Sequence, residues 1–292
     1  MFKIYAQLTK IGIVIFVVLS ALAGYAAGFQ LENQFSWIHF LKTLLGVYLL
    51  SSGSLALNQA QEYKLDQKMP RTSNRPVASG KVTPAAAMIL AIGFILGGIE
   101  LLVEVAPLAA VVGGLTIALY NGVYTYYWKP RWIYAAVPGA IPGALPVTIG
   151  YVAVNPDILG PESIYLFLIL FLWQMPHFWA LAIKFKDDYR AGGVPTLPVA
   201  LGMKRTVFQM GLYTFLYVGV ALASPWLIHA NWIYLALVVP TSAKILYEFF
   251  RFQKDAGDKN WLRFFIWINV SVLIYLFVPV IDKWSFLFIG SN

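Results

Sequence analysis

The chain contains no cysteine, and charged residues make up just 12% of its 292 positions. Without cysteine it can form no disulfide and offers no thiolate metal ligand or thiol nucleophile. It has 13 acidic residues against 21 basic ones, and it lacks low-complexity segments and any stretch typical of a soluble domain. Any chemistry therefore has to use oxygen and nitrogen side chains, and the scarce carboxylates are the first candidates.

What the chain has in excess is hydrophobic residues, which account for 60% of it. Apolar blocks long enough to cross a bilayer recur from end to end. We predict an all-α integral membrane protein that forms one polytopic domain over residues 1–292, with nine transmembrane helices around a central chamber. The predicted helices are 11–29, 38–61, 85–105, 107–127, 132–154, 163–184, 207–228, 230–250 and 262–281.

The first apolar block follows Lys3 and Lys10 and has the small-residue tail ALAGYAAG, which are also features of a signal peptide. Many more spans follow it, and no separate mature domain does. These two observations favour a first transmembrane helix over a cleaved signal peptide.

The basic residues gather on alternate loops. If the N-terminus is cytoplasmic, all of the 21 Lys and Arg residues except Lys42, Lys244 and Lys283 fall on the cytoplasmic side. This distribution satisfies the positive-inside rule and predicts a cytoplasmic N-terminus and an outside C-terminus. Topology alone thus accounts for the net charge of +8, and we expect no nucleic-acid partner.

Carboxylates among these cations are not explained by topology, because Asp and Glu contribute little to orientation and cost about 3 kcal/mol in hydrocarbon. Asn58, Glu62 and Asp66 are spaced four residues apart. They share one helix face if the helix extends beyond the apolar run. Pro70 would then end the helix, because proline lacks a backbone donor. The sequence therefore predicts a polar face at the cytoplasmic end of the second span.

A second acidic cluster, Asp187 and Asp188, follows the sixth predicted span at the same membrane face. Two such clusters suit a diphosphate held through Mg²⁺, which prefers oxygen ligands and substrate phosphates. The candidate metal ligands are Asn58, Glu62, Asp66, Asp187 and Asp188. The candidate diphosphate-binding cations are Lys68, Arg71, Arg75, Lys129, Lys186 and Arg190. The alternative is a set of interfacial carboxylates paired with neighbouring cations, which contribute little energy.

The segment NQAQEYKLDQKMPRTSNRP resembles the first signature, N-x-x-x-D-x-x-x-D, of the UbiA-type intramembrane prenyltransferases. Within that superfamily, MPRTSNRPVASGKV, GALPVTIGYVAV and FLWQMPHFWALAIKFKDDYRAGGVPTLPVALG look like the protohaem IX farnesyltransferase (haem O synthase) branch. The resemblance covers about residues 45–205 in motif detail and the whole chain in helix count.

Two positions depart from the family pattern. Glu62 stands where the family usually has Asp, which keeps the charge but lengthens the side chain. Lys184 and Gly192 lie four residues before and after Asp188, so the second D-x-x-x-D of the quinone-prenylating relatives is missing. The second departure favours the haem branch and weakens any assignment of two metal ions by analogy.

The resemblance implies that farnesyl diphosphate is ionised with Mg²⁺ at the cytoplasmic face and that a vinyl group of haem b captures the allylic cation. Water then completes a hydroxyethylfarnesyl group. It implies catalytic roles for Asn58, Glu62, Asp66 and Asp188. The partners it implies are farnesyl diphosphate, haem b, the lipid bilayer and other membrane enzymes of haem synthesis, in a bacterial cytoplasmic (inner) membrane.

Two alternatives to this function remain open from the sequence. Within the same class, a sister enzyme would prenylate an aromatic acid or a quinone precursor. In another class, a secondary transporter would also have broken helices and polar residues inside the membrane. Transporters usually place such residues near the midplane, whereas the carboxylates here are predicted at one face.

His177 lies inside the sixth predicted span, about two and a half turns before Asp187. An intramembrane histidine is a functional candidate by default, and imidazole is a good ligand for haem iron. We therefore hypothesise that His177 contacts haem. The alternative is a histidine that hydrogen-bonds to a neighbouring helix.

Tyr120, Asn121, Tyr124 and Tyr127 recur at roughly helical spacing before Lys129. Aromatic residues of this kind often form a belt where the membrane meets water. They can also line a site and stabilise a cation over their ring faces. The pattern favours the belt.

Overall fold

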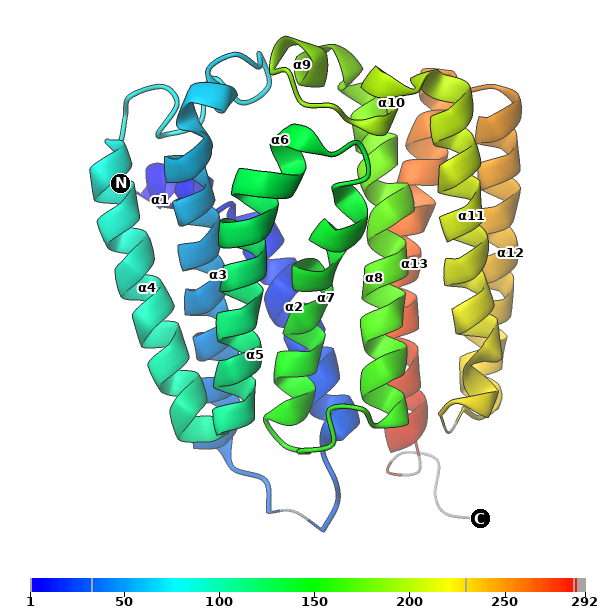
Figure 1. Cartoon of the computed structure of the whole chain (residues 1–292). Coiled ribbons are helices and arrows are strands. Elements are labelled where there is room, and N and C mark those ends of the chain that lie inside the picture. The colour runs from blue at the N-terminus through cyan, green and yellow to red at the C-terminus, as the bar shows by residue number, and fades with distance from the viewer. Residues whose placement is uncertain (1, 33, 229, 286, 288–292) are drawn as a thin grey trace.

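The computed structural model describes residues 2–32, 34–228, 230–285 and 287. Over these residues the chain is helical and contains no β-strand. Figure 1 shows the long helices standing side by side, with α3, α4 and α5 on one side of the bundle, α7 and α8 in the middle, and α11 and α12 on the other side. The short elements α6, α9 and α10 cluster at the upper end of that view.

The bounds of the elements follow the predicted ranges closely. The long helices are α2 (Ile11–Gly28), α3 (Trp37–Asp66), α4 (Pro84–Val105), α5 (Pro107–Ile117) with its π-helical continuation η1 (Ala118–Trp128), α7 (Ala136–Val152), α8 (Pro161–Lys184), α11 (Gly202–Ala223), α12 (Trp232–Lys254) and α13 (Asp258–Trp284). The short elements are α1 (Phe2–Leu8), α6 (Lys129–Arg131), α9 (Lys186–Ala191), α10 (Leu197–Ala200) and the 3₁₀ turn η2 (Ser224–Trp226).

Eight helices in the described part of the chain are long and apolar enough to cross a membrane. The remaining predicted span, 132–154, corresponds to α7, a shorter apolar helix of 17 residues that contains Pro142 and Pro146. Proline removes a backbone donor and disturbs the turn before it, which is tolerated in a membrane where other groups satisfy the freed carbonyls. This helix is therefore a natural place for an irregular wall.

The largest difference from the predicted helices is η1. Residues 118–128 adopt a π-helix where the sequence predicts a regular helix. A π-helix bonds each amide five residues back instead of four, so it turns its side chains to different directions and often occurs at functional sites. The α3 helix also runs to Asp66, past the predicted end of the span at 61.

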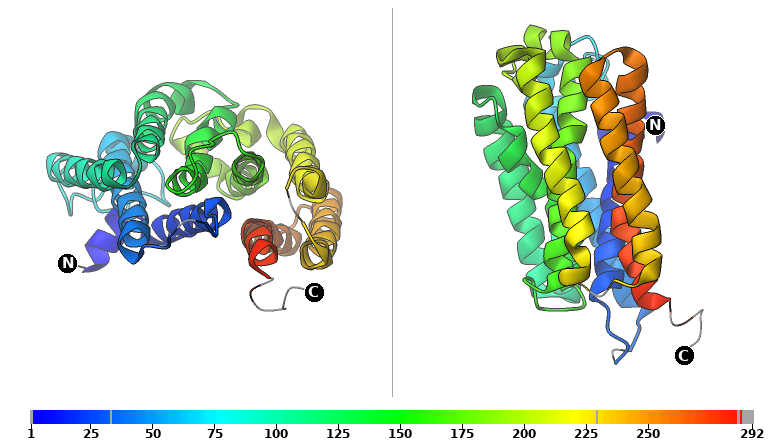
Figure 2. Two further views of the ribbon diagram at one scale, coloured as in Figure 1. Left: turned by 90° about the horizontal axis from the view of Figure 1, so that it is seen from below. Right: turned by 90° about the vertical axis from the view of Figure 1, so that its right-hand side faces the viewer.

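Small residues bring the central helices into close contact. A Cβ added to Gly24 on α2 would lie 1.9 Å from the carbonyl oxygen of Val147 on α7, and one added to Gly150 would lie equally close to that of Ala21. Only glycine permits such an approach of two backbones. The seen-from-below view in Figure 2 shows α2 lying beside the middle of the bundle. The C-terminal half of α2 is thereby held directly against α7.

The outer faces of the helices suit lipid. On α4, Ile89, Leu96 and Val103 are spaced seven residues apart and are all more than half exposed. A seven-residue spacing keeps them on one side of the helix. An apolar outer face with a polar interior is what a bilayer requires, because polar groups in hydrocarbon need partners inside the protein.

Candidate active site

A cavity of about 650 Å³ lies at the end of the bundle where α3 and α8 terminate. Its walls come from α2, α3, η1, α7, α8 and α13 and from the loop that follows α3. Charged side chains line one part of it, and apolar and aromatic ones line the rest. The charged residues that line it are Lys10, Glu62, Asp66, Arg71, Arg75 and Lys129.

The polar face of α3 points into this cavity. Asn58, Glu62 and Asp66 are 2%, 6% and 1% exposed, and all three are among the residues that line the cavity. They share a face because α3 stays helical to Asp66, which keeps residues four apart one above the other. The four-residue spacing in the sequence is thus realised as one buried stripe.

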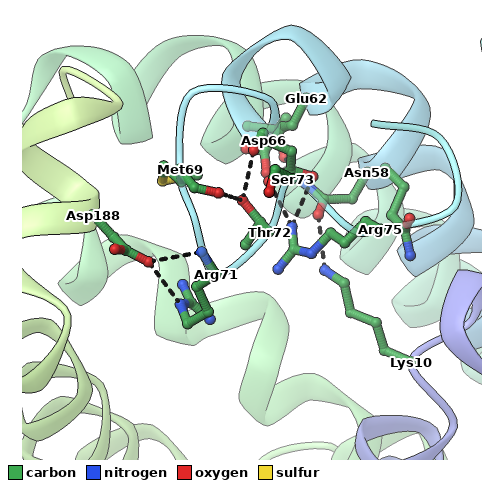
Figure 3. Close-up of polar contacts among 12 residues, drawn as sticks. Lys10, Asn58, Glu62, Asp66, Met69, Arg71, Thr72, Ser73, Arg75 and Asp188 are labelled. Atoms are coloured by element: carbon green, nitrogen blue, oxygen red, sulfur yellow. Dashed lines mark hydrogen bonds and ion pairs between the residues drawn. The ribbon is translucent and has the colours of Figure 1, made fainter. Parts of the chain in front are cut away.

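Each member of the stripe has a cation as its partner. Glu62 accepts hydrogen bonds from Lys129 Nζ at both carboxylate oxygens, each at 2.6 Å. Asp66 accepts from Arg75 Nη1 at both oxygens, at 2.7 and 2.8 Å. Asn58 Oδ1 accepts from Lys10 Nζ at 3.1 Å, as Figure 3 shows. Buried charges need such partners, because an isolated one would cost several kcal/mol.

Lys10 is a site residue that the sequence analysis used only for topology. It caps α2 with a left-handed backbone (φ 52°), which costs a lysine on the order of 1 kcal/mol. Its side chain reaches the cavity and bonds the amide of Asn58 rather than a carboxylate. Burial lowers the pKa of Lys10 to about 7. No local sequence signal separates it from an ordinary topogenic lysine.

The second acidic cluster approaches the first through Arg71. Asp188 Oδ2 accepts a hydrogen bond from the backbone amide of Arg71 at 3.1 Å, and Arg71 Nε lies 3.8 Å away. The guanidinium of Arg71 lies over the ring of Phe185 at 4.7 Å and over that of Tyr189 at 5.8 Å. Arg71 and Tyr189 line the cavity, but Asp188 does not. Asp188 thus lies outside the cavity and orients Arg71, which lines it (Figure 3).

Besides Asp188, four of the candidate residues do not line this cavity: Lys68, Lys186, Asp187 and Arg190. The side chain of Asp187 is 89% exposed and pairs with Arg190, three residues on, at 2.6 Å. The short helix α9 explains the difference from Asp188, because consecutive helical residues point in directions about 100° apart. The structure therefore brings one of the two neighbouring aspartates toward the site and not the other.

The π-helix divides the aromatic residues between two environments. Tyr120 and Tyr124 line the cavity with their rings stacked at 5.7 Å, whereas Tyr127 is 61% exposed. The belt interpretation fits Tyr127 but is wrong for Tyr120 and Tyr124. The wider turn of the π-helix directs these two rings inward, toward the carboxylates of α3.

A buried amide network holds η1 against α3. Asn121 accepts from Ser54 Oγ at 2.7 Å and donates to the Ser54 carbonyl at 2.9 Å. Its side chain also donates to Gln61 Oε1 at 3.2 Å, and Gln61 Nε2 donates back to the Asn121 carbonyl at 3.0 Å. Such reciprocal bonds fix two helices in one register. Asn121 therefore sets the position of Lys129 and the tyrosines relative to Glu62.

His177 lines the opposite wall of the cavity, on α8. Its ring lies 4.7 Å from that of Trp173 and 5.1 Å from that of Phe265. Its Nδ1 is buried and has no hydrogen-bond partner among the described residues. Asn269 of α13 also lines the cavity beside it. The histidine thus belongs to an aromatic wall that faces the same chamber as the carboxylates.

The chamber continues into an apolar arm of about 240 Å³ between α2, α3, α5 and α7. Most of the arm's lining is apolar, including Val47, Leu50 and Ile117. Three polar side chains line both the arm and the main cavity: Lys10, Tyr120 and Gln174. The site therefore combines a charged mouth, an aromatic wall and an apolar depth.

The oxygen atoms of the α3 stripe could bind a divalent cation that is also bound by the oxygens of an anionic ligand. Nowhere in the described chain do three His, Asp or Glu side chains gather closely enough to hold a metal ion alone. Glu62, Asp66 and Asn58 nevertheless offer oxygen ligands on one buried face. Mg²⁺ is commonly held by one or two carboxylates together with substrate phosphates and water. These residues fit that arrangement.

The chain is similar in sequence to a known protein family and to curated proteins. A family model described as the UbiA prenyltransferase family matches residues 17–269. The protoheme IX farnesyltransferase of Bdellovibrio bacteriovorus is 63% identical over 292 residues, which is 100% of both chains. The protoheme IX farnesyltransferase of Shouchella clausii is 32% identical over 96% of this chain and 90% of its own.

Solved structures share the fold at low sequence identity. A structure from a study of digeranylgeranylglyceryl phosphate synthase in membranes superposes with a TM-score of 0.78 at 16% identity, covering 97% of this chain and 99% of the other. A UbiA homologue from Archaeoglobus fulgidus bound to GPP and Mg²⁺ gives a TM-score of 0.66 at 15% identity over 95% and 99%. These two matches extend over nearly the full length of each chain.

Proposed function

Because the chain belongs to the UbiA prenyltransferase family, and so is a membrane prenyltransferase, we propose that it transfers a farnesyl group from farnesyl diphosphate to a vinyl group of haem b. The donor and acceptor are those of the protoheme IX farnesyltransferases that it resembles. The observation that carries the proposal is the buried carboxylate and cation face at the mouth of a chamber with an apolar arm.

The charged mouth is the proposed diphosphate site. Four basic residues line the cavity against two carboxylates, which leaves a surplus of two positive charges for an anion when Lys10 is protonated and of one when it is not. The cations are Lys10, Arg71, Arg75 and Lys129. Preorganised cations stabilise a leaving diphosphate most strongly when its charge grows, so their contribution lowers the barrier to ionisation.

Asn58, Glu62 and Asp66 are the residues that would hold Mg²⁺ against the diphosphate, and Asp188 supports the mouth by orienting Arg71. A bound Mg²⁺ would neutralise phosphate charge as the leaving group departs. An Archaeoglobus fulgidus homologue of the same fold is known with GPP and Mg²⁺ bound. Lys129 and Arg75 are already paired with Glu62 and Asp66, so an entering anion would interact with these cations alongside the two carboxylates.

The two other parts of the chamber suit the two apolar substrates. The arm beside Val47, Leu50 and Ile117 suits a farnesyl tail, which is purely hydrocarbon. The wall of Trp173, His177 and Phe265 suits the flat face of a porphyrin, and the imidazole is a candidate iron ligand. Enclosure between helices also keeps bulk water from the allylic cation.

The proposal extends to membrane topology. We propose that α7 crosses together with the eight longer helices, which gives nine spans with the N-terminus cytoplasmic and the C-terminus outside. The basic loops support this orientation, because positive residues favour the cytoplasmic side. Because the curated relatives come from bacteria, we also propose that the chain lies in a bacterial cytoplasmic membrane, where other membrane enzymes of haem synthesis are its expected partners.

The experiment that tests the proposal is a transfer assay with purified protein in lipid nanodiscs. It contains farnesyl diphosphate, haem b and Mg²⁺, and the haem products are separated and weighed by mass spectrometry. We expect a haem heavier by one farnesyl group and one hydroxyl group. Parallel reactions with 4-hydroxybenzoate test the sister activity. Prenylation of that acid in preference to haem, or of neither, would contradict the proposed acceptor.

A further inference from the structure

Gln174 occupies the point where the main cavity meets the apolar arm. It lies on α8, three residues before His177, and lines both spaces. Residues three apart on a helix lie on the same side, so the amide and the imidazole face one chamber. Apart from Ser51, Ser54 and Thr116, the other side chains that line only the arm are apolar.

The amide of Gln174 is held in one orientation. Its Nε2 donates to the carbonyl of Ala140 on α7 and to that of Leu170 on α8, each at 3.1 Å. Both amide hydrogens are thereby used, because a glutamine NH₂ has two donors. Its Oε1 has no donor among the described residues and is not sealed from the cavity. An oriented acceptor therefore remains free at the junction.

The neighbouring helix is shaped around this oxygen. A Cβ added to Gly143 would lie 2.0 Å from Gln174 Oε1, so any larger residue there would displace the amide. The other polar groups that line both spaces are Tyr120 and Lys10. An ordered water inside a protein needs two to four polar partners, roughly, and Gln174 and Tyr120 offer two, whereas Lys10 is already bonded to Asn58.

We propose that Gln174 holds the water molecule that ends the reaction, an inference that rests on the proposed function. Bond formation between farnesyl C1 and the terminal vinyl carbon breaks the C1–O bond, and the electron pair leaves with the diphosphate. The positive charge then lies on the vinyl carbon next to the porphyrin. The water oxygen bonds to that carbon, and the proton it loses passes to the released diphosphate.

The position of Gln174 suits this step. Gln174 lies on α8 with Trp173 and His177, whereas the carboxylate stripe lies on α3, so the acceptor oxygen is on the helix of the haem wall rather than on that of the proposed diphosphate site. A hydrogen bond accepted from the water directs the lone pairs of that water away from Gln174 and toward the cation. Without this water, the cation would lose a proton from the adjacent carbon and form an alkene.

The test is the product distribution of Gln174→Met, which keeps the length of the side chain and removes the acceptor. We expect the ratio of dehydrated to hydrated farnesyl haem to rise about tenfold, the factor that corresponds to about 1.4 kcal/mol, on the order of one hydrogen bond. Reaction of the wild-type protein in H₂¹⁸O should place the label in the new hydroxyl. The matched control is Gln67→Met, whose amide donates to the carbonyl of Ala78 but does not line the cavity.

An unchanged product ratio in Gln174→Met, with farnesyl transfer merely slower, would overturn the assignment and leave Gln174 as a tie between α7 and α8. If that variant is not recovered folded, Gln174→Asn gives the same test, because it withdraws the amide by one methylene and should also raise the ratio. Failure of the wild-type protein to make any farnesyl haem would instead contradict the proposed function itself. The two failures are therefore distinct.

Discussion

Asp66→Asn is the substitution that most directly tests the carboxylate stripe. Asp66 is 1% exposed, and both of its oxygens contact Arg75 Nη1 at 2.7 and 2.8 Å. Asparagine keeps the shape and one acceptor oxygen but removes the negative charge. The change therefore separates the contribution of the negative charge from that of side-chain packing.

The structure sets the expected size of two effects. Breaking a fully buried ion pair costs about 3–5 kcal/mol, but Arg75 is 24% exposed and retains one acceptor, so we expect about 1–2 kcal/mol of stability to be lost. Activity should fall much further. Losing a carboxylate that would hold Mg²⁺ against the leaving diphosphate should lower kcat/KM by about 10³-fold, which corresponds to about 4 kcal/mol.

The assay measures kcat/KM for farnesyl diphosphate over a range of Mg²⁺ concentrations and thermal unfolding in detergent. Excess Mg²⁺ should not restore the rate of Asp66→Asn, because a ligand is missing rather than weakly occupied. Asp258→Asn is the control, since its carboxylate is 88% exposed and pairs with Lys184 at the same end of the bundle. A kcat/KM for Asp66→Asn within tenfold of the wild-type value would refute the reasoning.

Three further predictions concern other parts of the site. Glu62→Asp should lower kcat by about tenfold, because it keeps the negative charge but withdraws it from Lys129. Glu62→Gln removes the charge and should lower kcat far more; equal effects of the two changes would show that the charge of Glu62 does not matter. Lys10→Met should raise KM for farnesyl diphosphate about tenfold without loss of thermal stability, because it removes a cation that has no carboxylate partner; an unchanged KM would contradict this. His177→Ala should shift the Soret absorbance of bound haem and weaken haem binding about tenfold, and an unaltered spectrum with lower thermal stability would identify a packing histidine.

The stripe on α3 could be predicted from sequence because its cause is local. A helix places residues four apart on one face whatever surrounds it, so Asn58, Glu62 and Asp66 needed only a continuous helix. Their partners could not be predicted in the same way. Lys10, Arg75 and Lys129 come from three separate segments, and the pairing depends on how α2, the loop after α3 and η1 pack.

The π-helix shows a second limit. Tyr120 and Tyr124 satisfy a helical period equally well in an α-helix and in a π-helix, so the pattern does not distinguish a membrane belt from a cavity wall. The difference comes from the bonds of Asn121 to Ser54 and Gln61, which are contacts between residues more than 50 positions apart. Asp187 and Asp188 illustrate the same point. The two aspartates are adjacent in the sequence, but α9 turns Asp188 toward Arg71 and leaves Asp187 exposed.

The pairing of every acidic residue in the mouth with a cation has a consequence for an enzyme inside a membrane. Unpaired carboxylates facing a chamber of low polarity would be costly or would become protonated, and either outcome would weaken the site before substrate arrives. Lys129 and Arg75 give Glu62 and Asp66 hydrogen-bonded partners and hold both carboxylates in place. An entering diphosphate then finds its cations already positioned, and little reorganisation is left for the transition state. The ion pairs that stabilise the chamber would thus also prepare it for the proposed reaction.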